Sequence, residues 1–201
     1  MDATGLFLEQ HANTHSSAMA KSPASLEDLV VSRLTDDQIR HQPQAGQNSI
    51  GWLIWHMARC EDVLNLVLSN QPQVIDDPDW PKRLNLSRRD IGTGMTDDEV
   101  SDFGAKVDVQ TVRAYRAAVG RRTREIAQNL RPDEWDSIVD ASRLRSAVSA
   151  GAFGDNAGWV EGWWSDQTQG FLLFWLAVGH NYLHLGEAQC VRSQAGVPVG
   201  L

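Results

Sequence analysis

The feature that most constrains the fold of this 201-residue chain is the spacing of its apolar residues. Across residues 50–68 and again across residues 109–130, apolar side chains recur every three or four positions, which is the period of one face of an α-helix. No segment shows the strict alternation of a half-buried β-strand. The chain is therefore predicted to be all-α, and the simplest arrangement is a single domain, residues 1–201, built as a four-helix bundle.

Residues with strong capping preferences mark where several helices should begin. Asn48 or Ser49 can cap the helix over residues 50–68, and Asp108 can cap the helix that follows it. Thr96 begins TDDE, which is the pattern of a capping box. The sequence thus predicts three helix starts from side-chain chemistry alone.

The first quarter of the chain is less regular. A first helix is expected from about Gly5 into the twenties, although Pro23 disfavours helical conformation beside it. A short helix is expected within residues 25–34 (SLEDLVVSRL), and residues 34–47 (LTDDQIRHQPQAGQ) are expected to be connecting sequence.

Two long irregular segments, about residues 71–95 and about residues 141–165, are predicted to be loops. Loops of this length in a compact domain are uncommon and often cover a site. We expect tryptophans from these segments to shape a pocket and exclude water from it: Trp80, Trp159, Trp163 and Trp164.

Composition narrows the possible partners. The net charge of −8 and the pI near 5.1 argue against binding to a phosphate backbone. The most apolar stretch, residues 171–185, is too short to span a bilayer, and the first residues lack the regions of a signal peptide. Cys60 and Cys190 do not make a disulfide framework. We expect a cytoplasmic protein that contacts neither nucleic acid nor membrane.

Two histidines lie four residues apart in the last apolar segment, FLLFWLAVGHNYLHLGEAQCVRSQ. On a helix this spacing puts His180 and His184 about one turn apart, so that both rings can reach one metal ion. His56, at the border of an apolar helix face, is the best candidate for a third ligand. The alternative is that these are buried core histidines satisfied by hydrogen bonds. As ligands, three neutral nitrogens would leave a coordination position open.

Other candidate side chains have weaker arguments. His11 and His15 are also four apart, but their polar sequence EQHANTHSS predicts positions on the surface or at a cavity rim. Cys60 could act as a thiolate ligand beside His56, although packing as a small apolar side chain is favoured. Glu187 could be a fourth ligand, a general base, or an acceptor that orients a histidine. The sequence HNYLH lacks the glutamate of HExxH, which argues against a metalloprotease.

The order of these motifs resembles the DinB-like superfamily of metal-binding four-helix bundles. The resemblance rests on LTDDQIRHQP, SIGWLIWHMARCEDVLNLVL and GHNYLHLGEAQCVRSQAG, and it covers about residues 5–196. It implies that the family's metal triad corresponds to His56, His180 and His184. It also implies a homodimer and a divalent ion: zinc, nickel, iron or manganese. Family members with known activity include transferases and isomerases that use bacillithiol, mycothiol or glutathione, among them mycothiol-dependent maleylpyruvate isomerase.

Three functions are compatible with this sequence. In the leading hypothesis, the ion binds a low-molecular-weight thiol as thiolate, which attacks a small electrophile, so that the protein is a metal-dependent transferase. In the second, the same ion carries hydroxide and the protein is a metal-dependent hydrolase of a small substrate. In the third, the protein is a non-catalytic helical dimer that binds a metal or a small molecule. Glu187 is the one candidate for a catalytic side chain outside the triad.

Overall fold

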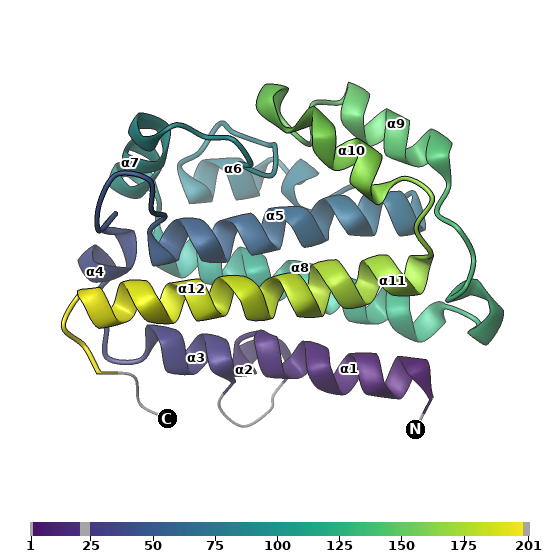
Figure 1. Ribbon diagram of the computed structural model, residues 1–201, viewed down its shortest axis with the longest axis horizontal. Coiled ribbons are helices and arrows are strands. Elements are labelled where there is room, and N and C mark those ends of the chain that lie inside the picture. The colour runs from purple at the N-terminus through teal and green to yellow at the C-terminus, as the bar shows by residue number, and fades with distance from the viewer. Residues whose placement is uncertain (1, 21–24, 199–201) are drawn as a thin grey trace.

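The computed structural model describes residues 2–20 and 25–198 and shows an all-α bundle (Figure 1). The long helices are α5 (Ile50–Ser69), α8 (Val109–Asn129) and α12 (His180–Gln194), the last preceded by α11 (Gln169–Phe174). The fourth position is filled by a row of shorter helices: α1 (Ala3–Thr14), α2 (Ser17–Ala20) and α3 (Leu26–Val31). The described residues contain no β-strand, and none of their helices is long and apolar enough to cross a membrane.

Helix α5 is the centre of the bundle. The Ser49 side chain caps it by accepting a hydrogen bond from the backbone N–H of Trp52, as predicted. Every residue of α5 except Leu66 and Ser69 is buried, because α8, α9 and α12 all pack on it. Any polar group on α5 must therefore find its partner inside the protein.

The other two predicted helix starts are confirmed. Thr96 and Glu99 form the capping box of α7 (Asp97–Lys106), and Asp108 caps α8 by accepting from the N–H of Thr111. Helix α8 ends at Asn129, before the short 3₁₀ turn Pro132–Glu134.

The first helix is shorter than predicted. Helix α1 ends at Thr14 because His15 is extended (φ −109°, ψ 158°). The backbone N–H of Ser17 donates to the Asp28 carboxylate at 2.8 Å. A side-chain oxygen thus takes the place of the backbone carbonyl that would accept from this N–H in a continuous helix. The expected disruption at Pro23 lies outside the described residues. The short helix within residues 25–34 is confirmed as α3.

The prediction that residues 34–47 are only connecting sequence is wrong. They contain α4 (Asp36–Arg40), which starts with a capping box between Thr35 and Gln38. The backbone N–H of Thr35 lies 2.9 Å from the Gln38 side chain.

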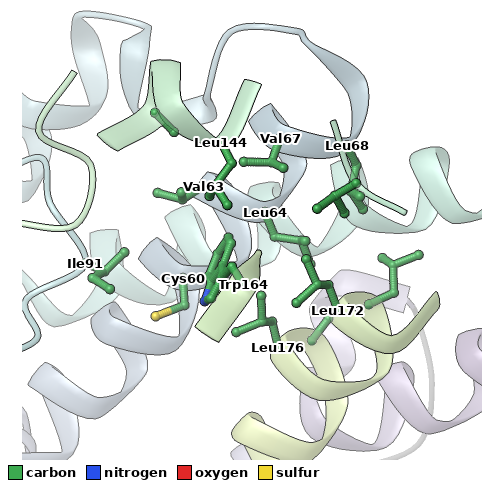
Figure 2. Close-up of a cluster of buried hydrophobic side chains, with 14 of the residues drawn as sticks. Cys60, Val63, Leu64, Val67, Leu68, Ile91, Leu144, Trp164, Leu172 and Leu176 are labelled. Carbon is green, nitrogen blue, oxygen red and sulfur yellow. The ribbon is translucent and has the colours of Figure 1, made fainter. Parts of the chain in front are cut away.

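The two predicted loops also contain helices, and the expectation of irregular structure is wrong for them. The first holds the 3₁₀ turn η1 (Val74–Asp76) and α6 (Asp79–Leu84). The second holds α9 (Ala141–Ser149), the 3₁₀ turn η3 (Asp155–Ala157) and α10 (Gly158–Trp164). These helices are too short to show periodicity, and they are held by packing: Trp164 is buried beside Cys60, Leu172 and Leu176 (Figure 2).

A π-helical turn, Trp175–Gly179, joins α11 to α12. There the backbone N–H of His180 donates to the carbonyl of Trp175, five residues back. The Asn181 side chain donates a hydrogen bond to the backbone carbonyl of Ala177 at 2.7 Å, so this carbonyl of the π-helical turn has a partner. Turns of this kind insert one residue into a helix and are frequent at functional sites.

Candidate metal centre

The three histidines singled out in the sequence come together between α5 and α12. One ring nitrogen of each lies within 4.8 Å of the others. The Nε2 atoms of His180 and His184 are 3.0 Å apart, and the His56 ring centroid lies 5.1 and 5.0 Å from theirs. Two nitrogens bound at about 2.1 Å to one ion, at a right angle, are separated by about 3.0 Å. The three side chains could therefore hold one metal ion.

The contacts of His56 leave one of its nitrogens free. Its Nδ1 lies 2.5 Å from the carbonyl oxygen of Ile91, and a carbonyl only accepts, so Nδ1 carries the proton and Nε2 a lone pair. The residue after Ile91 is Gly92, whose φ of +79° lies in a region that favours glycine. A Cβ at Gly92 would also overlap the Trp55 ring. Trp52 stacks on the imidazole at a centroid distance of 4.7 Å. The tautomer and the ring plane are thus both fixed.

His184 is oriented by a carboxylate. Its Nδ1 lies 2.9 Å from Oε2 of Glu187, while the other carboxylate oxygen accepts from the Asn48 side chain at 3.2 Å. A carboxylate only accepts, so in the tautomer that fits this contact Nδ1 carries a proton and Nε2 is the nitrogen available to a metal. Of the three roles considered for Glu187, its position matches the acceptor that orients a histidine.

His180 follows directly after the π-helical turn. Its Nε2 points to His184, and its Nδ1 is buried and has no hydrogen-bond partner among the described residues. Burial lowers the pKa of His56 to about 4 and, together with the neighbouring His56 and His184, lowers the pKa of His180 well below its usual value. Because imidazole binds metals in its neutral form, both rings are suited to ligation at neutral pH.

Cys60 lies one turn after His56, with its Sγ 3.8 Å from Nε2 of that ring. Burial raises the pKa of the thiol to about 12, so the group is protonated in the absence of a metal. The side chain belongs to the buried apolar cluster of Figure 2. Apolar packing, the favoured expectation, therefore describes its surroundings.

A cavity of about 360 Å³ opens beside His56 and His180. Four tryptophans form much of its wall, and Ile91, Val160 and Leu176 add apolar surface: the tryptophans are Trp159, Trp163, Trp164 and Trp175. None of the described residues that form the cavity wall carries a carboxylate. The expectation that tryptophans of both predicted loops shape a pocket is thus confirmed for residues 141–165, and residues 71–95 contribute Ile91 and Thr93 to the wall.

Two expectations about tryptophans need correction. Trp80 does not line this cavity; its ring packs at 5.5 Å from that of Tyr115 and under the guanidinium of Arg83. Trp175 does line it, and sequence reasoning missed it. The signal was its place five residues before His180 in the same apolar segment.

The surface or cavity-rim positions predicted for His11 and His15 are wrong. Both side chains are fully buried, and the Nε2 of each lies 2.9 Å from a different oxygen of Glu61. Their polar neighbours in sequence gave no indication of this, because Glu61 comes from α5. Glu61 was not singled out, although a carboxylate in so apolar a helix must have a buried partner. His41, by contrast, is exposed.

A family model described as the DinB superfamily matches residues 18–188. The crystal structure of a conserved protein from Enterococcus faecalis is similar, with a TM-score of 0.67 and 18% identity over 96% of this chain and 97% of that one. At that identity, the similarity shows the fold alone. No curated protein sequence matches the chain.

Proposed function

The chain belongs to the DinB superfamily, and we propose that it is a metal-dependent transferase that holds one divalent ion with His56, His180 and His184. The observation that carries this proposal is the convergence of three histidines beside an apolar cavity. Three nitrogen ligands leave a coordination position open, and the cavity gives a small molecule access to His56 and His180.

A divalent ion with an open position lowers the pKa of a coordinated thiol and so supplies a thiolate near neutral pH. The proposed cosubstrate is a low-molecular-weight thiol, and the ion is zinc, nickel, iron or manganese, all of which accept imidazole. The residues of the chain orient the ligands and form the binding site for the second substrate. Ile91 and Glu187 hold the rings of His56 and His184, and the tryptophan wall binds the apolar part of a small electrophile and excludes water.

The composition of the cavity wall favours thiol transfer over the hydrolase alternative. Hydrolysis by metal-bound water is commonly assisted by a general base. Glu187, the one carboxylate considered for that role, is engaged by His184 and Asn48 and does not line the cavity. A thiolate needs no such base at the moment of attack, because its proton has already left.

The proposal can be tested by spectroscopy. Protein purified without a polyhistidine tag, in a Cys60→Ser background, would be stripped of metal, loaded with cobalt and titrated with bacillithiol, mycothiol and glutathione. We expect at least one thiol to produce a thiolate-to-cobalt charge-transfer band. His184→Ala should abolish the band, and His41→Ala, at an exposed position, should retain it. Cobalt bound without a band for any thiol would contradict the transferase and leave the hydrolase or a non-catalytic binding protein.

We also propose that the protein is a homodimer that pairs through the outer face of α11 and α12. Phe171 of α11 and Tyr182 and Leu183 of α12 are exposed, and Leu183 is 62% accessible. Exposed apolar patches of this kind commonly mark interaction surfaces. Sedimentation at micromolar concentration should show a dimer, and Leu183→Glu should shift it towards monomer. A wild-type monomer would contradict this interface.

A further inference from the structure

A second group of metal-ligating side chains lies elsewhere in the bundle. His11, at the end of α1, and His15, directly after it, meet Glu61 of α5. Glu61 follows His56 by five residues and so projects about 140° away from it around the helix axis. The donor atoms of the three side chains lie within 4.8 Å of one another. This group, the closed cluster, is distinct from the histidines at the cavity.

The distances in the closed cluster match those of ligands on one ion. Nε2 of His11 lies 2.9 Å from Oε1 of Glu61, and Nε2 of His15 lies 2.9 Å from Oε2. Neighbouring ligands about 2.1 Å from one ion are about 3.0 Å apart when their bonds are at right angles. Three side chains therefore offer four donor atoms: two nitrogens and both oxygens of the carboxylate.

The closed cluster buries a carboxylate between two imidazoles, and all three side chains are inaccessible to solvent. The buried guanidinium of Arg116 does not pair with Glu61, because it is bonded to Glu27 at 2.7 Å. A buried carboxylate favours the binding of a cation beside it.

The two rings are oriented by packing. Within the described part of the chain, the Nδ1 atoms of His11 and His15 are buried and have no hydrogen-bond partner, so no hydrogen bond at Nδ1 turns the Nε2 atoms towards Glu61. Phe7 stacks on His11 at 5.3 Å, and Gly120 of α8 leaves room for His15, because a Cβ there would lie 2.8 Å from that ring.

We propose that His11, His15 and Glu61 form a closed structural site that binds one zinc ion. Two imidazole nitrogens and both oxygens of the carboxylate would supply the four donors that zinc usually takes, and the full burial of the three side chains leaves no open position. All three side chains are fully buried, so no substrate reaches the ion. Thr123 donates to Oε1 of Glu61 at 2.5 Å and holds the carboxylate in place. The ion fastens the N-terminal helix to α5.

The test is the number of zinc ions per chain, and it does not depend on the proposed transferase activity. Full-length protein without a tag, with exposed Cys190 changed to serine in every variant, would be equilibrated with buffered zinc and analysed by mass spectrometry. We expect two ions in this background and one in His180→Ala/His184→Ala. Adding Glu61→Gln or His15→Asn to that double variant should remove the remaining ion, while adding His41→Ala should not.

A second measurement guards against misfolding of the Glu61 variant. In the His180→Ala/His184→Ala protein, zinc should raise the melting temperature relative to a chelator, and magnesium should not. The closed site is overturned if that folded protein binds no zinc, or if Glu61→Gln leaves its zinc content unchanged. If only the proposed cavity site were wrong, the Cys190→Ser parent would bind one zinc ion. The His180→Ala/His184→Ala variant would then bind the same single ion.

Discussion

The two histidine clusters of the bundle are built alike and placed differently. Each combines two histidines four residues apart with one residue of α5: His56 in the cluster at the cavity and Glu61 in the closed cluster. The first opens onto an apolar cavity and its histidines are held by a backbone carbonyl and by Glu187. The second is fully buried and carries its own carboxylate. Access to solvent, rather than the spacing of the ligands, separates a site suited to chemistry from one suited to holding helices together.

The two clusters should also differ in how much they contribute to the free energy of unfolding. A group that is fully buried and hydrogen-bonded cannot be altered without leaving its partners unsatisfied, whereas a partly exposed group can be replaced by water. The closed cluster should therefore determine stability and the cavity cluster should determine metal exchange. Three predictions test this division.

Glu61→Gln should lower the free energy of unfolding of the metal-free protein by about 3 kcal/mol, because His11, His15 and Thr123 lose an ionised acceptor. Urea denaturation followed by circular dichroism in the presence of a chelator measures this change. His184→Ala, whose side chain is 16% accessible, is the matched control and should cost less than about 1 kcal/mol. Equal losses in the two variants would remove the distinction between the clusters.

Glu187→Gln should weaken metal binding at the cavity cluster by about 10-fold, because the amide is a poorer acceptor for Nδ1 of His184. Competition with a chromophoric chelator measures the affinity. A fall well beyond 100-fold would mean that Glu187 is itself a ligand, and no fall would mean that it does not orient His184. The zinc content of the closed cluster should be the same in the wild-type protein and in Glu187→Gln.

The stability of the metal-free protein should decrease as the pH falls below 6.5. His15 has a pKa of about 3 when folded and near 6.5 when unfolded, so the unfolded chain binds more protons between these values. The stabilisation is complete above pH 6.5 and falls by about 1 kcal/mol over the first unit below it. Urea denaturation across this range measures the slope. His15→Asn should reduce the pH dependence of the free energy of unfolding by that amount. If His15→Asn leaves the pH dependence unchanged, groups other than His15 cause it.

The parts of the fold that follow from local sequence were predictable. Ser49, Thr96 and Asp108 marked helix starts because a cap is a contact within three residues. The start of α4 carries the same signal in Thr35 and Gln38, but the helix that follows has only five residues and so shows no apolar period. Helices α6, α9 and α10 were missed because they depend on packing against the bundle.

The two clusters show the same limit at the level of sites. His180 and His184 stood out because histidines in an apolar segment contradict their surroundings. His11 and His15 did not stand out, because the residues next to them are polar. Their hydrogen-bond partner Glu61 is 46 or more positions away in the sequence. The contact between Glu61 and these rings is set by how α1 docks on α5, which no local pattern records.

The π-helical turn at Trp175–Gly179 makes the cavity cluster tolerant of a change in chain length at this one place. The turn holds one residue more than an α-helical turn, so deleting one residue there, such as Ala177, would leave a continuous α-helix. Four α-helical residues turn the chain by about 400°, close to the rotation that the residues of the wider turn complete, so His180 and His184 would keep facing His56. A deletion in the regular helix between His180 and His184 would instead rotate His184 away by about 100°. The extra residue of the turn is therefore one that the chain can lose while the three histidines keep their arrangement.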